Sequence, residues 1–285
     1  MSEAAKPVAL DAGYAARTPQ EVPGDLGGAL ALDRVTMTFA AGKRTAVTAL
    51  SDLDIAVAPG EFVSIVGPSG CGKSTVIRLA AGLERATAGS VTIDGRPPAE
   101  LARTHELGVA FQDHALLPWL TAADNVALPF RVAGRRVEHA RVVELLKLVG
   151  VHDFSGSRPR ELSGGMRQRV AIARALVLDP TVLLLDEPFG SLDAVTRRRL
   201  NIELQRVWLE RPVTTVLVTH SVDEAIFLAD RVLVLSSRPG QVILEEHVPF
   251  SRPRPPELLV DPRLHRMEVR LIEALEAGER TGAEP

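Results

Sequence analysis

The sequence Gly67-Pro-Ser-Gly-Cys-Gly-Lys73-Ser74 decides the fold class, because it joins the apolar run 62–66 to a stretch with helical spacing, 74–83. It matches G-x-x-x-x-G-K-[ST] in the strand-to-helix context that this pattern requires. Glycines let the backbone wrap around phosphates, and successive N–H groups at a helix N-terminus attract the negative charge. The alternative, a glycine-rich turn that binds nothing, is disfavoured by these flanks. The segment predicts a phosphate-binding loop.

The side chains of this loop indicate how it binds a nucleotide. Lys73 is expected to reach the β and γ phosphates as a point charge, and Ser74 to offer its hydroxyl to Mg²⁺. Cys71 is either a small residue that fits the loop or a redox switch, since thiols near helix N-termini gain acidity. The residues expected to bind the nucleotide are Gly67, Pro68, Ser69, Gly70, Cys71, Gly72, Lys73, Ser74 and Thr75.

Two adjacent carboxylates end a second apolar run, Val182-Leu-Leu-Leu-Asp186-Glu187. A phosphate-binding loop needs a partner for the metal and a group that activates the attacking water. Asp186 suits the metal, while Glu187 is the candidate general base beside the γ phosphate. The alternative is a solvated turn at a strand end, which the phosphate-binding loop makes less favourable.

Composition narrows the functional classes. The chain has 285 residues, of which 46% are hydrophobic and 24% charged, as in globular proteins. Its 33 basic and 36 acidic residues give a formal charge of −3, so no bulk basic field favours non-specific nucleic-acid binding. The single cysteine, Cys71, cannot form an intrachain disulfide and fits a reducing compartment. We therefore expect a cytoplasmic protein without a nucleic-acid partner.

No segment is apolar enough to cross a bilayer. A spanning helix needs about 20 mostly apolar residues, whereas the longest stretches without Asp, Glu, Lys or Arg, 62–72 and 212–222, have 11 residues. Near the N-terminus, Glu3, Lys6 and Pro7 interrupt the apolar run that a signal peptide needs. Association with a membrane would then be peripheral.

From residue 29 onward, short Val, Ile and Leu runs alternate with longer helical patterns, which predicts an α/β fold with a mostly parallel sheet. Residues 1–28 mix Ala, Pro and Gly without a period and predict a flexible extension. We expect the main domain over 29–245 and a short tail with a helix over 246–285. The expected strands are 30–39, 53–57, 62–66, 90–93, 109–111, 182–185, 214–218 and 231–235.

A helical insertion is predicted over about 112–178, because no buried-strand pattern appears there while 121–132, 137–149 and 164–178 suit helices. After Pro249, further prolines break the chain before a final stretch, 262–277, whose apolar residues recur at helical spacing. A short capping helix is the expected structure of this tail.

Leu162-Ser163-Gly164-Gly165-Met166 resembles the signature motif of the ATP-binding cassette (ABC) family. Ser163 is a helix N-cap residue, and the two glycines permit close approach of a phosphate to the helix N-terminus. Alone, the motif could be no more than a capped helix. The phosphate-binding loop, Gln112, the 186–187 carboxylates, 191–193 and His220 follow in the order of the family. The resemblance implies a P-loop ABC cassette with an antiparallel β-subdomain, ATP and Mg²⁺ as ligands, and ATP hydrolysis.

Four further roles come from the resemblance alone. It makes Phe39 the aromatic residue that stacks on adenine, although packing in the core is the alternative for a residue at a strand end. It makes Gln112 the residue that links Mg²⁺ and the attacking water to the helical insertion, and His220 a contact of the γ phosphate. It assigns Ser163, Gly164 and Gly165 to the ATP site of a second cassette, so that two chains enclose two nucleotides head to tail.

Within the family, the chain resembles importer cassettes for nitrate, taurine and aliphatic sulfonates over about 29–245. The resemblance rests on Phe111-Gln-Asp-His-Ala-Leu-Leu-Pro-Trp119, on 204–208, on 219–231, and on Ser237-Arg-Pro-Gly240 with the Arg252-Pro-Arg254 tail. It implies a peripheral subunit on the cytoplasmic face of the membrane, bound to permease subunits that receive their solute from a binding protein. The extension 1–28 exceeds the family minimum, and no large regulatory domain follows the cassette.

Two rival classes of function are disfavoured: a soluble ABC ATPase of DNA repair or translation, and a P-loop kinase or GTPase. A soluble ABC ATPase of DNA repair would carry a long coiled coil, but residues 112–163 are short and lack sustained heptads. A translation factor of the family would carry two cassettes, whereas one is present here. A P-loop kinase or GTPase has no role for residues 162–166.

A partner surface is indicated by the apolar residues Leu116, Leu117, Trp119 and Leu120, which follow Gln112. They suit a partly exposed groove that receives a short permease helix, with packing in the core as the alternative.

Overall fold

The computed structural model describes residues 28–41, 45–190 and 192–281. The flexible extension predicted over 1–28 thus falls, as far as residue 27, outside the described residues. Gly28 itself is buried, and its N–H donates a hydrogen bond to the carbonyl of Thr181 at 3.1 Å. The packed domain therefore includes residue 28, one position earlier than predicted.

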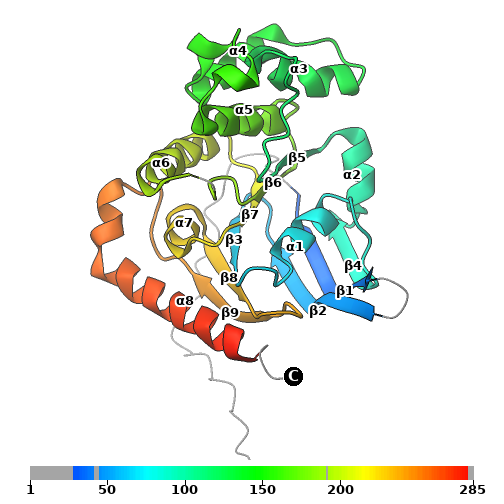
Figure 1. Cartoon of the computed structure of the whole chain (residues 1–285), viewed down its shortest axis with the longest axis vertical. Helices are drawn as coiled ribbons and strands as arrows, with labels where there is room; N and C mark the ends of the chain where they lie inside the picture. Colours follow the sequence, from blue (N-terminus) through cyan, green and yellow to red (C-terminus); the bar gives the residue numbers. More distant parts are fainter. Residues whose placement is uncertain (1–27, 42–44, 191, 282–285) are drawn as a thin grey trace, which may run out of the picture.

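The main sheet confirms the mostly parallel α/β fold (Figure 1). Its first five strands are parallel in space, and the last runs antiparallel to its neighbour. In spatial order they are β5 (Leu107–Ala110), β6 (Val182–Asp186), β7 (Thr214–Val218), β3 (Phe62–Val66), β8 (Arg231–Leu235) and β9 (Val242–His247). Every residue of β3, β6 and β7 is buried, which explains their continuous apolar sequences.

A smaller antiparallel sheet, predicted from the family resemblance, covers one side of the main sheet. Its strands are β2 (Thr45–Val57), β1 (Leu30–Ala41) and β4 (Ala88–Ile93), in that spatial order. β2 begins eight residues before the predicted strand 53–57, because the stretch before Leu53 also pairs with β1.

The insertion between β5 and β6 is helical. It holds α3 (Ala122–Val132), α4 (His139–Leu148) and α5 (Gly164–Leu176), which Figure 1 shows together at the top of the molecule. Residues 112–178 are described in full and contain no strand. The core helices are α1 (Lys73–Ala80), α2 (Pro98–Thr104), α6 (Ala194–Glu210), α7 (Val222–Leu228) and α8 (Pro262–Thr281). No helix within the described ranges is long and apolar enough to cross a membrane.

Alternation along β3 divides the interior into two cores. Phe62 and Val66 face the cluster formed with α5, α6, α7 and α8. Val63 and Ile65 face the cluster formed with α1 and the small sheet. Because β3 pairs with β7 on one side and β8 on the other, it is buried in every direction, and the loop after it has a fixed position.

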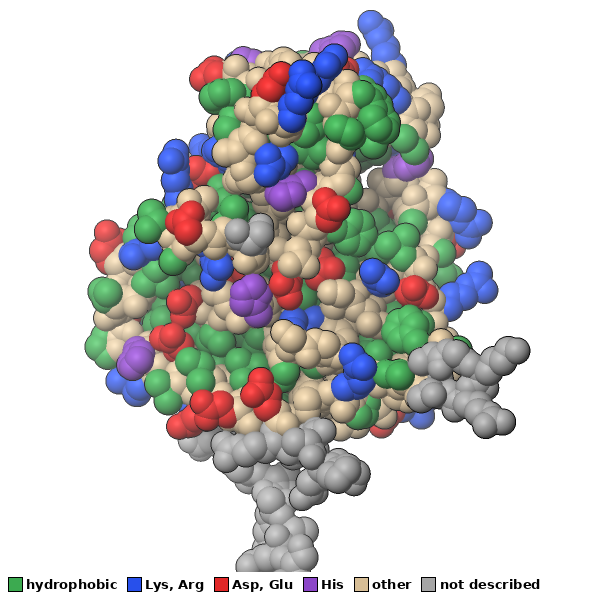
Figure 2. All heavy atoms as spheres, in the orientation of Figure 1, with side chains coloured by type: hydrophobic (Ala, Val, Ile, Leu, Met, Phe, Trp, Pro, Cys, Tyr) green, Lys and Arg blue, Asp and Glu red, His purple; other side chains and the backbone are tan. Residues whose placement is uncertain are grey.

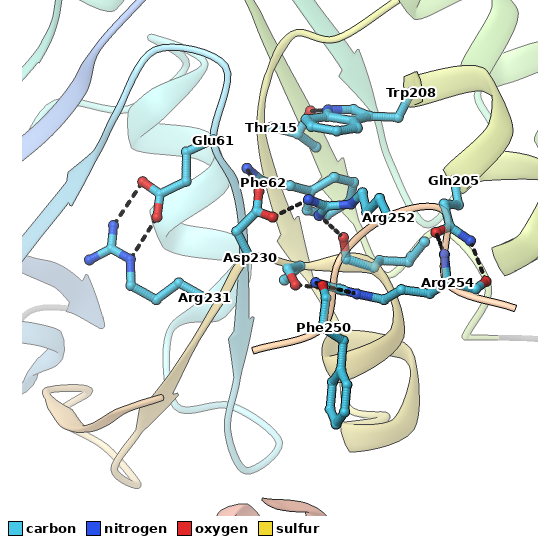
Figure 3. Close-up of polar contacts among 12 residues, drawn as sticks. Glu61, Phe62, Gln205, Trp208, Thr215, Asp230, Arg231, Phe250, Arg252 and Arg254 are labelled. Carbon is cyan, nitrogen blue, oxygen red and sulfur yellow. Dashed lines mark hydrogen bonds and ion pairs between the residues drawn. The ribbon is translucent and has the colours of Figure 1, made fainter. Parts of the chain in front are cut away.

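The C-terminal tail belongs to this packed structure. β9 extends to His247, so the predicted boundary near residue 245 lies inside a strand. Between β9 and α8, the guanidinium of Arg252 stacks 4.5 Å from the ring centre of Trp208 and forms an ion pair with Asp230 (Figure 3). The second carboxylate oxygen of Asp230 accepts the backbone N–H of Phe62 at 3.0 Å, which connects the tail to the first residue of β3.

Arg254 anchors the same tail without a carboxylate partner. Its side chain is 2% exposed and donates to the carbonyls of Ile226, Phe227 and Ala229 at 2.7–3.0 Å. It also donates to the carbonyl of Phe250 at 3.0–3.1 Å. The first three carbonyls lie at the C-terminal end of α7 and just beyond it, where a helix lacks partners of its own. A single buried cation therefore satisfies several backbone acceptors.

We expect Arg254→Ala to lower the free energy of unfolding by about 3 kcal/mol or more, because each buried acceptor left unsatisfied costs about 1–3 kcal/mol. Urea unfolding followed by circular dichroism measures the change. The matched control is Arg199→Ala, whose side chain is 78% exposed on α6 and should change stability by at most about 0.5 kcal/mol. Equal effects of the two substitutions would contradict the anchoring role.

Candidate nucleotide-binding site

A cavity of about 370 Å³ opens where the carboxyl ends of the parallel strands meet the small sheet. Ligands of open α/β sheets bind at this edge, outside the carboxyl ends of the strands. The cavity is lined by Phe39, Val47, Ala49, Ser69, Gly70, Gly72, Lys73, Ser74, Thr75, Glu187 and Arg238. Residues more than 150 positions apart in the sequence therefore share one site.

The loop between β3 and α1 shapes the floor of the cavity. Lys73 is 6% exposed, and its ammonium group donates to the carbonyls of Gly67 at 2.7 Å and Pro68 at 2.9 Å. Gly72 has φ 108°, and a Cβ there would lie 2.9 Å from the carbonyl oxygen of Ala49, so only glycine fits. No side chain caps the N-terminus of α1 at Gly72. An anion in the cavity can take the place of that cap.

Ser74 and Asp186 come together at the side of the cavity. The Ser74 hydroxyl donates to Oδ1 of Asp186 at 3.0 Å. Burial raises the pKa of the Asp186 carboxyl, and the nearby Glu187 carboxylate raises it further, while the hydrogen bond from Ser74 opposes both. The described residues contain no cluster of three or more His, Cys, Asp or Glu placed to hold a metal. Mg²⁺ usually takes one or two protein oxygens besides phosphates and water, so this pair fits Mg²⁺.

Glu187 follows β6 with its backbone in an unusual conformation. Its φ is 45°, in the left-handed region, and its N–H donates to the carbonyl of Val218 at 2.8 Å. Non-glycine residues held there store strain, which is found at functional sites. The turn directs the side chain to the cavity, where Oε2 lies 3.2 Å from Nδ1 of His220. The structure thus brings the candidate base and the predicted γ-phosphate contact together.

Cys71 packs inside the loop. Its side chain is 1% exposed. Burial raises the pKa of the thiol, although Lys73 and Arg238 oppose this effect with their positive charges. A thiol kept neutral and away from solvent is a poor redox switch. This supports the interpretation that a small residue is needed to fit the loop.

The signature residues lie elsewhere in the chain. Ser163 caps α5 as predicted, accepting the N–H of Met166 at 3.3 Å. Neither Ser163, Gly164, Gly165 nor Gln112 lines the cavity. The structure brings together the loop, Phe39, the two carboxylates and His220, but it does not bring the signature or Gln112 to them.

Arg238 is a lining residue that sequence reasoning did not identify. It lies in the turn after β8, and its guanidinium donates to the carbonyl of Gly70 at 3.0 and 3.1 Å. The signal that could have found it is the order of the strands: β8 lies beside β3, so the turn after β8 must approach the phosphate-binding loop.

Comparisons with known proteins agree with this geometry. Residues 50–190 match the family model described as "ABC transporter". A nitrate import ATP-binding protein from Synechococcus elongatus is 43% identical over 87% of this chain and 92% of its own length. An aliphatic sulfonates import ATP-binding protein from Bacillus cereus is 41% identical over 80% and 90%, respectively. A taurine import ATP-binding protein from Burkholderia pseudomallei is 42% identical over 86% and 96%.

Solved structures give the same result. A dimeric bacterial ABC transporter cassette has a TM-score of 0.69 at 35% identity, covering 78% of this chain and 100% of its own. The post-hydrolysis state of the same cassette, bound to ADP and Pi, aligns with a TM-score of 0.69 at 34% identity over the same shares of the two chains. The cavity over the phosphate-binding loop and the match along most of the sequence lead to one conclusion: this chain belongs to the ABC transporter ATP-binding family and is an ATPase.

Proposed function

We propose that the chain hydrolyses ATP to drive import of a small anionic solute, of the nitrate, taurine or aliphatic sulfonate class, through separate permease subunits at the cytoplasmic face of the membrane. A solute-binding protein acts indirectly, by delivering the solute to the permease. The observation that carries the proposal is the 41–43% identity to import ATP-binding proteins over 80–87% of the chain. The soluble alternative in DNA repair or translation has no comparable support.

The residues of the cavity divide the chemistry between them. The backbone of residues 67–75 and the Lys73 ammonium bind the phosphates, and Lys73 exchanges its two carbonyl acceptors for phosphate oxygens. Ser74 and Asp186 hold Mg²⁺, which offsets the charge of the phosphates when it is bound. Phe39, which lines the cavity, stacks on adenine.

Glu187 is the general base in this proposal. Its carboxylate faces the cavity and takes a proton from the water that attacks the γ phosphate. His220 lies within hydrogen-bond distance of that carboxylate, so it can orient Glu187. The contact of His220 with the γ phosphate is the role that the family resemblance implies. Gln112, which does not line the cavity, would link Mg²⁺ and the attacking water to the helical insertion.

Two chains are needed to complete the site. The cavity of each chain is not lined by its own signature residues, Ser163, Gly164 and Gly165. Ser163 caps α5, whose N-terminal N–H groups favour an anion. We infer a head-to-tail homodimer in which each signature closes over the ATP of the other chain. The dimeric cassette among the similar structures supports this arrangement.

The permease docks, in our proposal, on the cleft between the main domain and the helical insertion. A cavity of about 240 Å³ there is lined by residues of α2, β5, α3 and α5, among them Leu107 and Pro129, and by Leu178, which follows α5. Figure 2 shows the surface hollowed where these two parts meet. Leu116 packs against the main core. For this residue, the structure agrees with the alternative of core packing rather than with an exposed groove. Trp119 is 66% exposed, so this large aromatic side chain is accessible to a permease helix.

Deletion of the gene for this chain in its native host should abolish uptake of at least one of three radiolabelled solutes, nitrate, taurine or an alkanesulfonate. A plasmid copy should restore that uptake, and a copy carrying Glu187→Gln should not. Phe154→Ala, which alters an exposed aromatic side chain of the insertion, serves as a folded control that restores uptake. Normal uptake of all three solutes after deletion, together with sensitivity to DNA damage, would favour the soluble alternative.

Glu187→Gln should reduce ATP turnover by on the order of a hundredfold or more while ATP still binds, because the substitution removes basicity but retains size and hydrogen bonding. The stalled variant should form a dimer with Mg²⁺ and ATP that persists during size-exclusion chromatography, whereas the unmodified chain returns to monomer.

The double variant Glu187→Gln with Ser163→Arg tests the second chain's role. It should bind ATP as a monomer and fail to dimerise, since the signature acts on the nucleotide of the partner. Normal turnover by Glu187→Gln would eliminate Glu187 as the base, and loss of ATP binding on Ser163→Arg would place Ser163 in the site of its own chain.

We also propose that Arg238, which lines the cavity beside the phosphate-binding loop, binds a phosphate of ATP. Arg238→Ala should then raise the KM for ATP about tenfold with little change in kcat, because a charged hydrogen bond contributes about 1.5–3 kcal/mol to binding. Steady-state hydrolysis assays measure both constants. Arg270→Ala on α8, outside the cavity, is the control for loss of one surface cation. An unchanged KM would show that Arg238 does not bind the phosphates and only stabilises the loop through its hydrogen bonds to Gly70.

A further inference from the structure

Glu224 is a buried carboxylate close to the proposed catalytic residues that the function described so far does not use. It lies in the first turn of α7 and is 2% exposed. Its Oε1 is buried and has no hydrogen-bond partner among the described residues. An incompletely paired carboxylate in the interior is costly, so its presence requires a reason.

One neighbour connects Glu224 to the loop of His220. The Thr219 side chain hydrogen-bonds to the Glu224 carboxylate and lowers its pKa, which favours the charged form. Thr219 directly follows β7. Its N–H donates to the carbonyl of Ile65 at 3.1 Å, and its hydroxyl accepts the N–H of Ser221 at 3.1 Å. The residue between Thr219 and Ser221 is His220, so Glu224 holds the turn that presents His220.

The other neighbour connects Glu224 to the loop before α6. The Arg197 guanidinium donates from Nη2 to the carbonyl of Leu192 at 3.0 Å. Its Nε is buried and, within the described part of the chain, has no partner. The positive charge of Arg197 also favours the charged form of Glu224. A buried donor and a buried acceptor of opposite charge thus lie near each other without a direct hydrogen bond.

We propose that Glu224 is a positioning residue for ATP hydrolysis: its carboxylate attracts Arg197 on one side and Thr219 on the other, and so sets the separation between the Leu192 loop and the His220 loop. The proposal rests on the roles proposed for Glu187 and His220. Leu192 precedes the N-cap Asp193 of α6, and both loops border the turn that carries Glu187. A change in the Glu224 charge therefore alters the geometry around the γ phosphate rather than the binding of ATP.

The charge has a cost in stability. Burial raises the pKa of Glu224 to about 7, and the negative charge of Glu187 adds to this effect, while Thr219 and Arg197 oppose it. The neighbouring carboxyl on α7, Asp223, interacts with Glu268 of α8 and also with Arg197. Since the folded pKa of Glu224 exceeds the ordinary value of 4.5, the folded state binds its proton more tightly than the unfolded state. Its contribution to stability falls as the pH rises from about 4.5 to about 7.

Glu224→Gln tests the proposal, because it keeps the shape and the hydrogen bond to Thr219 while removing the charge. We expect the melting temperature of the variant to equal or exceed that of the unmodified chain at pH 8 and to match it at pH 5.5. At pH 8 its kcat should fall about tenfold with the KM for ATP nearly unchanged. The rise of kcat between pH 6 and pH 8 in the unmodified chain should be absent from the variant.

Three further measurements sharpen the test. Glu210→Gln, at a carboxyl near the C-terminal end of α6 whose side chain is 52% exposed, should leave kcat and its pH profile unchanged. Arg197→Met should lower kcat to the same extent as Glu224→Gln, and the double variant should be no worse than either, because the two residues act as one unit. Arg197→Lys should restore part of the activity.

Two results overturn the proposal. One is a normal kcat for Glu224→Gln, and the other is a fall in melting temperature at both pH values that parallels the fall in kcat, as a purely structural role predicts. Failure of the proposed function is distinguishable, because it appears as normal turnover by Glu187→Gln, whatever Glu224→Gln does.

Discussion

Burial of β3 on all sides is the constraint on which the rest of the structure depends. Its two faces supply both cores, and its neighbours β7 and β8 occupy both edges. The carboxyl ends of these strands and of β6 consequently meet at one place. The residues just after each strand are thereby gathered there: the loop with Lys73, the 186–187 carboxylates, His220, and the turn with Arg238. A nucleotide site arises there because the parallel sheet aligns these ends.

The sequence predicts the fully buried strands well, because burial on both faces gives them continuous apolar sequences. The predicted bounds of β3, β7 and β8 match the observed strands, since strands covered on both faces are continuous runs of apolar residues. β9 was not predicted, because its burial alternates and its sequence, VILEEH, ends in charged residues. α6 was also missed, since AVTRRRLNIELQRVWLE carries charges around much of its surface, so its helical period is weak.

The residues of the candidate site also differ in how well the sequence predicts them. Lys73, Asp186 and Glu187 could be predicted because each belongs to a local motif whose chemistry depends on its neighbours in the chain. Arg238 and Glu224 could not, since their roles come from contacts that the strand order creates. Arg238 meets Gly70 across 168 positions, and Glu224 acts through Arg197 on another helix. Glu224 follows His220 by four residues in the sequence, but no local pattern there indicates the interaction with Arg197.

The central place of β3 also constrains how the chain is made. Phe62 pairs with Thr215 in β7, so about 150 residues must be synthesised after Phe62 before its partner exists. At about 5–20 residues per second, the wait is about 8 to 30 s. During that time an apolar strand with two open edges is exposed to other chains, and such strands aggregate. Nascent cassettes of this topology should therefore depend on ribosome-associated chaperones more than their final stability suggests.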